Sequence, residues 1–224
     1  MSSANSPIKI AGWKKVSLID YPGKVASVIF LAGCNMCCHY CHNHHILDSR
    51  KNQVSFNVVL RELRRCRDWV NAVVVSGGEP SLYPNLIPLL QSLKSLGLLV
   101  KLDTNGTRPA VVKKIVNLGL VDYIALDIKA PPLKHVEITG LPIDAVLETA
   151  NFLKRQKQIP YQFRTTLSPF LCLNDLIIMA EKIIGSVSWQ IQQCRCSHAY
   201  SPEEIKKMVS VLKRYNPHIV VKGL

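Results

Sequence analysis

The stretch Cys34-Asn35-Met36-Cys37-Cys38-His39-Tyr40-Cys41 places four cysteines within eight residues. Read with the spacing C-x3-C-x2-C, three of them can wrap one inorganic cluster from a single loop, namely Cys34, Cys38 and Cys41. A four-iron cluster held by four cysteines is coordinatively full and suits electron transfer, whereas three ligands leave one iron open to another molecule. The stretch therefore predicts an iron–sulfur cluster with one open coordination position.

A zinc site is the second interpretation of the same loop, with Cys34 and Cys37 as one pair and Cys38 and Cys41 as the other. Zinc ribbons and fingers usually separate their two pairs by roughly a dozen residues or more. Here the pairs abut, and the adjacent Cys37 and Cys38 would approach one tetrahedral ion poorly. The iron–sulfur interpretation is favoured, and Cys37 is then a bystander. Three histidines follow the loop and are interpreted as surface or pocket polar groups rather than extra ligands: His42, His44 and His45.

The length and composition of the chain limit the kinds of protein it can be. The chain has 224 residues, of which 48% are hydrophobic, so it can bury a large core in one domain. Its first residues lack the basic-then-apolar pattern of a secretory signal, and no apolar run approaches the roughly 18 residues of a membrane span. We therefore expect a cytoplasmic protein that does not contact a membrane. Eight cysteines in that compartment favour metal binding over a disulfide framework.

The chain is basic, with a formal net charge of +13. Such a surface suits nucleic acid, an acidic redox partner or phosphate-bearing ligands. The basic residues are scattered, however, and the one dense run, at 61–67, lies on a predicted helix where it forms the solvated face. Nucleic acid is therefore not the expected partner. A non-enzymatic zinc-binding or nucleic-acid-binding module remains the alternative from a different functional class.

Hydrophobic patterning predicts strands that alternate with helices. Strands are expected at 24–31, 72–76, 98–103, 123–127, 161–167 and 187–192, and helices at 55–70, 85–96, 109–118, 145–157, 175–184 and 201–214. Six strand-then-helix units imply a parallel sheet with right-handed crossovers. They are too few for a closed eight-unit barrel. The predicted fold is α/β, a partial (β/α)6 barrel that is open on one side.

One domain, 1–224, accounts for the whole pattern. Residues 1–23 are expected to form an N-terminal arm, 24–192 the six-strand core, and 193–224 a C-terminal loop and helix, with a candidate final strand at 219–221. Ligands in such folds bind at the C-terminal ends of the strands. The polar turns after the first four strands lie at that edge. Arg164 and Gln190, within the last two strands, are expected to face the same pocket.

The cysteine loop, with the aromatic Tyr40 one residue before the third cysteine, resembles the signature of the radical S-adenosylmethionine superfamily. The resemblance implies that the three thiolates hold a [4Fe-4S] cluster whose open iron binds S-adenosylmethionine. Reductive cleavage of that molecule yields a 5′-deoxyadenosyl radical that abstracts hydrogen, while the protein supplies orientation and excludes water. It also implies that Tyr40 lies beside the adenine. The turn Gly77-Gly78-Glu79-Pro80 resembles the second motif of the superfamily, in which backbone groups and the glutamate receive the methionine ammonium.

A narrower resemblance is to the activating enzymes of glycyl-radical proteins, and the closest branch activates anaerobic ribonucleoside-triphosphate reductase. Six segments carry it: 17–24 (SLIDYPGK), 30–35 (FLAGCN), 41–43 (CHN), 103–106 (DTNG), 127–129 (DIK) and 163–166 (FRTT). The resemblance implies a glycyl-radical reductase and a flavodoxin-like or other low-potential electron donor as partners. It also implies that five residues surround S-adenosylmethionine and the incoming peptide: Asp103, Asn105, Asp127, Lys129 and Arg164. The first two also suit an ordinary turn, and Asp127 with Lys129 also suits a simple ion pair.

Two departures from this family pattern stand out. Relatives usually carry a basic residue where this chain has Cys37, and commonly a proline where it has His39, so the surroundings of the cluster differ. Near the C-terminus the chain reads QQCRC at 192–196, where relatives often read QQFRP. Cys194 and Cys196 are either ligands to a second metal or a redox partner, or ordinary thiols. The alternative within the superfamily is an enzyme that modifies a small heterocycle or nucleoside precursor, on a deazapurine route to modified tRNA.

Overall fold

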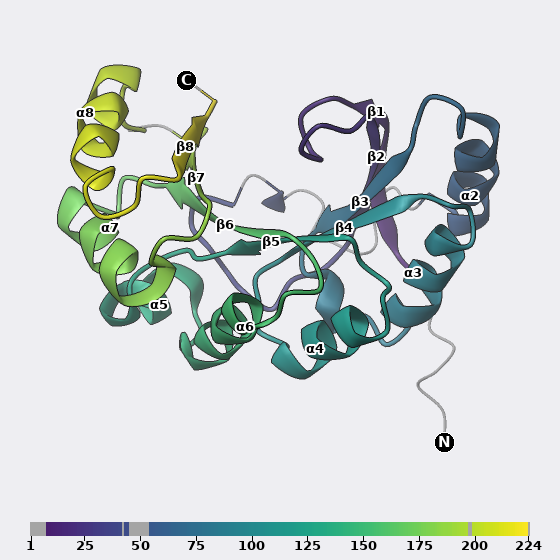
Figure 1. Cartoon of the computed structure of the whole chain (residues 1–224), viewed down its shortest axis with the longest axis horizontal. Coiled ribbons are helices and arrows are strands. Elements are labelled where there is room, and N and C mark those ends of the chain that lie inside the picture. The colour runs from purple at the N-terminus through teal and green to yellow at the C-terminus, as the bar shows by residue number, and fades with distance from the viewer. Residues whose placement is uncertain (1–7, 42, 45–53, 197–198, 224) are drawn as a thin grey trace.

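A computed structural model describes residues 8–41, 43–44, 54–196 and 199–223 of the chain. Within these ranges a single sheet has eight strands in the order β1 to β8. The strands are β1 (Ile10–Ser17), β2 (Ala26–Leu31), β3 (Ala72–Gly77), β4 (Leu99–Thr104), β5 (Tyr123–Asp127), β6 (Tyr161–Leu167), β7 (Trp189–Gln193) and β8 (Ile219–Lys222). The first strand is antiparallel to β2, and each later neighbour pair is parallel. The sheet curves but does not close, because β1 and β8 are its two edges (Figure 1).

Helices cover the outer side of the curved sheet (Figure 1). They are α2 (Phe56–Arg65), α3 (Leu86–Lys94), α4 (Pro109–Asn117), α5 (Pro132–Thr139), α6 (Asp144–Arg155), α7 (Leu173–Met179) and α8 (Pro202–Leu212). A short 3-10 turn, η1 (Pro80–Leu82), follows β3, and a π-helical turn, η2 (Ala180–Ile184), continues α7. Strand–helix–strand connections between parallel neighbours are the pattern expected of a barrel. The predicted α/β partial barrel is therefore confirmed.

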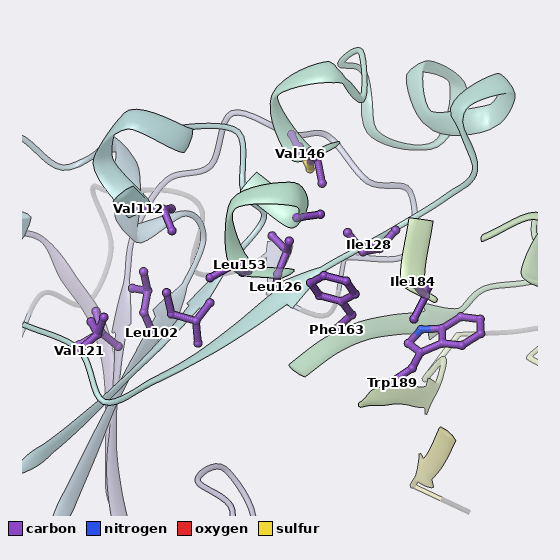
Figure 2. Close-up of a cluster of buried hydrophobic side chains, with 14 of the residues drawn as sticks. Leu102, Val112, Val121, Leu126, Ile128, Val146, Leu153, Phe163, Ile184 and Trp189 are labelled. Carbon is purple, nitrogen blue, oxygen red and sulfur yellow. The ribbon is translucent and has the colours of Figure 1, made fainter. Parts of the chain in front are cut away.

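Period-two alternation along the later strands decides which side chains face the helices. Leu126, Phe163 and Trp189 point outward into the main hydrophobic core, together with residues of the covering helices such as Val146 (Figure 2). The large indole of Trp189 is fully buried, and its Nε1 donates a hydrogen bond of 2.9 Å to Thr165 Oγ1, so no polar atom of the ring is left without a partner. The alternate side chains of the same strands, which are mostly polar, must therefore face the inside of the curve.

A second, smaller cluster of apolar residues lies on the inner side of the sheet. It contains Tyr21, Ala26, Val28, Ala72 and Val74, which come from the first halves of β2 and β3 and from the loop before β2. Because Ala72 and Val74 alternate with Val73 and Val75 of the main core, β3 is buried on both faces. The apolar cluster fills the inner face toward the N-terminal strand ends and leaves the C-terminal ends for polar groups.

The N-terminal arm and several helix bounds differ from the sequence predictions. The arm contains β1, whose backbone hydrogen bonds come from β2 and so could not be inferred from its own mixed composition. The helix expected to reach Val70 ends at Arg65, and Ser55 precedes it without a side-chain cap. The helix expected at 175–184 is split into α7 and η2. Helix α5 was not predicted, because its eight residues carry little amphipathic pattern.

Other expectations are confirmed. Strands β5 and β6 have the predicted bounds, and the candidate strand at 219–221 is β8. Helix α8 begins near its predicted start with a capping box, in which Ser201 and Glu204 exchange side-chain-to-backbone hydrogen bonds. Among the described residues, no helix is both long and apolar enough to cross a membrane.

Candidate active site

A cavity of about 270 Å³ lies at the C-terminal ends of the parallel strands. It brings together most of the residues singled out from the sequence: Cys34, Cys38, Tyr40, Cys41, Gly77, Gly78, Asp103, Asn105, Asp127, Lys129 and Arg164. Residues that sequence reasoning did not place there also line it: Asp20, Met36, Asn43, Ser76, Thr104, Thr166 and Gln192. A site at this edge is expected of a parallel α/β sheet. The predicted residues thus meet in one cavity, with Glu79, Pro80 and Gln190 as the exceptions.

One wall of the cavity is the cysteine loop. The thiols of Cys34, Cys38 and Cys41 face it, and the sulfur of Cys34 lies 3.4 Å from the backbone N–H of Met36 and 3.8 Å from Asn105 Nδ2, both of which donate to it. Burial raises the pKa of the Cys34 and Cys38 thiols. Donors aimed at a sulfur stabilise its thiolate form, which is the form that binds iron. These features fit a metal cluster held by this loop.

Cys37 is turned away from that wall. Its side chain is exposed, and Sγ lies 3.6 Å from the backbone oxygen of Thr139 in α5. Within the described ranges, no three His, Cys, Asp or Glu side chains converge on one metal ion. A cuboidal cluster contacts each thiolate through a different iron, so its ligands need not converge in that way. His44 is exposed and does not line the cavity, and His42 and His45 lie outside the described residues.

The two glycines after β3 allow the cysteine loop to pass close to the turn. A Cβ on Gly78 would lie 1.8 Å from the backbone oxygen of Gly33, and one on Gly77 would lie 2.3 Å from the backbone oxygen of Leu31. Backbone hydrogen bonds hold the two segments together: Gly78 N donates to Leu31 O (2.8 Å) and Glu79 N donates to Gly33 O (2.9 Å). The glycines are therefore required by backbone packing as well as by their position in the cavity lining.

Glu79 is fully buried and does not line the cavity. Its carboxylate accepts hydrogen bonds from Ser81 N and Oγ, from Thr104 Oγ1 (2.7 Å) and from Asn105 N (2.6 Å). Burial raises the pKa of this carboxyl group, although the four donors oppose that shift. Glu79 thus ties the turn after β3 to the turn after β4. Pro80 is also buried behind the cavity wall, and contact of either residue with a ligand stays a prediction.

Another part of the cavity lining is a network of charged side chains on β4, β5 and β6 and directly after β5. Arg164 donates to Asp103 Oδ2 (2.9 Å) through Nη1 and to Asp127 Oδ1 (2.6 Å) through Nε, and Lys129 Nζ lies 3.2 Å from Asp127 Oδ2. Burial alone would raise the pKa of both carboxyl groups, but the neighbouring cations outweigh it and lower both pKa values. The same carboxylates raise the pKa of Lys129 and Arg164 against the effect of burial. All four groups are therefore charged at neutral pH.

Lys101 belongs to this network and was missed by sequence reasoning. Its side chain is only 2% exposed, and Nζ donates to Asp103 Oδ1 (2.5 Å) and to the backbone oxygen of Asp20 (2.8 Å). The available signal was its spacing of two from Asp103, which places both on one face of a strand. Gln190 was predicted to face the pocket but is buried beside Gln162, and Gln192, on the same face of β7, lines the cavity instead.

Tyr40 lines the cavity from the cysteine loop and is mostly buried. Its hydroxyl group has no hydrogen-bond partner among the described residues, and burial raises its pKa. Buried hydroxyl groups are normally paired, so one that borders a cavity fits a site in which a polar ligand is bound. The three thiols that face the cavity, the unpaired hydroxyl group of Tyr40 and the paired charges of the network together fit a metal cluster with a polar organic ligand.

Cys194 and Cys196, which follow β7, are joined in a disulfide. The expectation that Cys194 and Cys196 are ligands or ordinary thiols is therefore wrong. Cys194 is buried in the main core, whereas Cys172 and Cys37 are exposed free thiols. The pair does not line the cavity, although Gln192 beside it does.

Known proteins resemble this chain in sequence over most of its length. The family model described as the Radical SAM superfamily matches residues 28–183, which is more than half of the chain. A protein of Methanocaldococcus jannaschii, whose name describes it as a glycyl-radical enzyme activating enzyme, is 30% identical over 232 residues and 96% of each chain is covered. The pyruvate formate-lyase-activating enzyme of Staphylococcus epidermidis is 31% identical over 185 residues, which cover 76% of this chain and 73% of that enzyme.

Solved structures share the fold at lower identity. SuiB of Streptococcus suis matches with a TM-score of 0.68 and 15% identity over 88% of this chain, which spans about half (49%) of SuiB. A domain of the pyruvate-formate lyase-activating enzyme of Bacteroides vulgatus matches with a TM-score of 0.57 and 18% identity, covering 68% of this chain and 99% of that domain. These structural matches support the open α/β barrel.

Proposed function

The chain belongs to the radical SAM superfamily and, within it, to the glycyl-radical enzyme activating enzymes, and from this premise we propose that it activates an anaerobic ribonucleoside-triphosphate reductase. As a radical SAM enzyme it uses a [4Fe-4S] cluster and S-adenosylmethionine, which together supply a low-potential electron and a radical able to abstract hydrogen. In the proposed reaction that hydrogen comes from a glycine Cα of the reductase.

The observation that carries the proposal is the single cavity between two unlike walls. Cys34, Cys38 and Cys41 face it from one side and are the proposed ligands of one cluster. Cys37 contacts α5 instead and is not a proposed ligand. Three thiolates leave one iron open, which is the property that a cluster binding S-adenosylmethionine requires.

The other wall supplies positioned polar groups for S-adenosylmethionine and the peptide. Asp103, Asp127, Lys129 and Arg164 are locked to one another on adjacent strands, so little side-chain freedom remains to be lost on binding. Asn105, with its amide nitrogen near Cys34, and Tyr40, with its unpaired hydroxyl, lie where they can contact the same ligand. The backbone of Gly77 and Gly78 is proposed to contact the methionine portion, and the buried Glu79 and Pro80 to shape that turn from behind.

The choice of partner rests on sequence resemblance, above all at residues 17–24 and 127–129. The open sheet supports a protein substrate, because no strand within the described part of the chain closes the barrel and a loop of a large partner can enter it. The net charge of +13 supports an acidic, flavodoxin-like electron donor, since opposite charge accelerates association. Both partners are proposed to meet the chain in the cytoplasm.

The direct test is transfer of the radical to the reductase under anaerobic conditions. The reconstituted chain is mixed with S-adenosylmethionine, a reductant and the cognate anaerobic reductase, and the glycyl radical is followed by electron paramagnetic resonance. We expect a glycyl signal on that reductase and a far weaker one on a pyruvate formate-lyase used as a matched competitor. A glycyl signal on pyruvate formate-lyase alone would contradict the proposed partner. Turnover of a small heterocycle without any protein radical would favour the nucleoside-modifying alternative.

A further inference from the structure

The cysteine loop touches a part of the fold that no motif indicated, the C-terminal turn of α5. The backbone N–H of Cys37 donates to the backbone oxygen of Thr139 (3.0 Å), and Cys37 Sγ lies 3.6 Å from the same oxygen. The next residue, Gly140, ends α5 with a positive φ of 79°. A Cβ on Gly140 would lie 2.5 Å from Cys37 Sγ. The loop therefore packs against this turn, and a side chain at position 140 would meet the end of the Cys37 side chain.

Buried polar side chains fix the shape of that turn. His135 and Thr139 are both fully buried. His135 Nδ1 donates to Leu141 O (2.7 Å), Thr139 Oγ1 donates to His135 O (2.7 Å), and Leu141 N donates to Thr139 Oγ1 (3.2 Å). Groups paired in this way lose little further freedom when another segment docks on them. The turn is thus a rigid surface rather than a frayed helix end.

A second contact joins the loop to the same part of the fold. The ring of His39 lies 5.9 Å from that of Phe170, centroid to centroid. Lys134 of α5 donates to Phe170 O (3.2 Å) and to Asp175 Oδ2 of α7 (2.7 Å), so α5 and the segment around Phe170 are held together beside α7 (Figure 1). The cysteine loop therefore rests on one connected support at both residue 37 and residue 39.

We propose that the C-terminal turn of α5 is a positioning element for the cluster, with Thr139 and Gly140 as its docking surface and Cys37 as the residue that docks. The proposal rests on the assignment of Cys34, Cys38 and Cys41 as the cluster ligands. Residue 37 lies between the first two of these, so anchoring its N–H fixes the direction in which the backbone enters Cys38. Outer groups that orient metal ligands commonly change metal affinity when they are removed.

The test uses Gly140→Ala and a matched control, Gly119→Ala. Gly119 follows the end of α4 with a similar φ of 65°, but a Cβ there would meet no atom within 4 Å. Both variants therefore carry the same backbone strain, and only Gly140→Ala also pushes on Cys37. The double variant Gly140→Ala/Cys37→Ala removes the sulfur that the new methyl group meets.

The readout is the rate at which a chelator extracts iron from anaerobically reconstituted protein, together with the electron paramagnetic resonance spectrum of the reduced cluster. We expect Gly140→Ala to lose iron about 10-fold faster than Gly119→Ala and to show an altered spectrum. The double variant should return to within about 2-fold of the control on both measurements. Equal rates for the two single variants, or no recovery in the double variant, would overturn the proposal. If the wild-type chain binds no cluster, it is the assignment of the ligands that fails.

Hydrogen exchange on the wild-type chain gives a measurement that needs no variant. In protein without cluster, the amide of Cys37 should already be protected, because its partner Thr139 belongs to the folded core. Exchange of this amide at the rate of an unstructured peptide would contradict a support formed before the cluster binds. This measurement remains decisive if Gly140→Ala fails to fold.

Discussion

The two walls of the cavity are built in opposite ways. The cysteine wall is a loop held by close backbone packing, and burial raises the pKa of Cys34 and Cys38, so burial opposes their thiolate forms and a bound cation would favour them. The strand-end wall consists of side chains on rigid strands whose charges already neutralise one another, as in the contact of Arg164 with Asp103 and Asp127. The charges of the strand-end wall are paired with one another, whereas the proposed ligands of the cysteine wall would be stabilised as thiolates by a bound metal.

The largest effect is expected where the strand-end wall loses its central cation. Arg164→Met leaves Asp103 and Asp127 buried with fewer partners, and we expect a loss of about 3–5 kcal/mol in the free energy of unfolding, measured by denaturant titration. The control is Lys113→Met, which breaks the exposed pair with Glu148 and should cost about 1 kcal/mol or less. Equal small losses would mean that the network is not a rigid wall.

On the cysteine wall, the corresponding change is Gly78→Ala. Its methyl group would overlap the backbone oxygen of Gly33, so we expect a loss of about 3 kcal/mol, or rearrangement of the loop. Gly23→Ala is the control, because a Cβ there meets no atom within 4 Å and only its positive φ is unfavourable, at a cost of about 1 kcal/mol. Thermal unfolding compares the two. A Gly78 variant as stable as the Gly23 variant would show that close packing does not hold the loop.

A smaller effect is expected for Lys101→Met, which keeps the volume of the side chain but removes its charge. Asp103 retains Arg164, so the loss should be about 2 kcal/mol, the size of a hydrogen bond to a charged group. The backbone oxygen of Asp20 also loses its donor, and the loop at 17–24 should exchange amide hydrogens faster. Unchanged exchange in that loop would contradict the role of Lys101 in joining it to the wall.

The smallest effect is a difference between the acid sensitivities of the two walls. Burial lowers the pKa of His135, beneath the cysteine loop, from its ordinary value of 6.5. Its unfolded form therefore takes up a proton first, and its contribution to stability is complete above about pH 6.5 and is lost as the pH falls below that value. Asp103 and Asp127 have lowered pKa values, so their contribution is lost only below their ordinary value of 3.8.

Unfolding measured between about pH 7.5 and about pH 5 tests this difference. The slope of stability against pH in this window should flatten in His135→Asn, whereas Lys113→Met, at an exposed ion pair, should leave the slope unchanged. The same slope in wild type and His135→Asn would show that the buried imidazole does not contribute to it.

Sequence reasoning succeeded where a residue type and a period decide the structure. The cysteine spacing and the position of polar residues at the C-terminal strand ends predicted that Cys34, Asp127 and Arg164 meet at one edge of the sheet, and the structure brings all three to one cavity. It failed where the partner is distant in sequence. Strand β1 needs β2, α5 is short and weakly patterned, and a lysine such as Lys101 appears exposed until its carboxylate partner is in place. The burial of Glu79 could not be predicted, because two of the four groups that donate hydrogen bonds to its carboxylate lie at the end of β4 and directly after it.

The central claim is that Cys34, Cys38 and Cys41 alone hold the cluster that faces the charged wall. The most direct measurement is formation of 5′-deoxyadenosine by anaerobically reconstituted protein with dithionite and S-adenosylmethionine. We expect Cys34→Ala to form none above the background of cluster-free protein. The sulfur of Cys66 donates a hydrogen bond to Glu62 O and does not line the cavity. We therefore expect Cys66→Ser to form as much 5′-deoxyadenosine as the wild type. Wild-type product formation by Cys34→Ala would contradict the account.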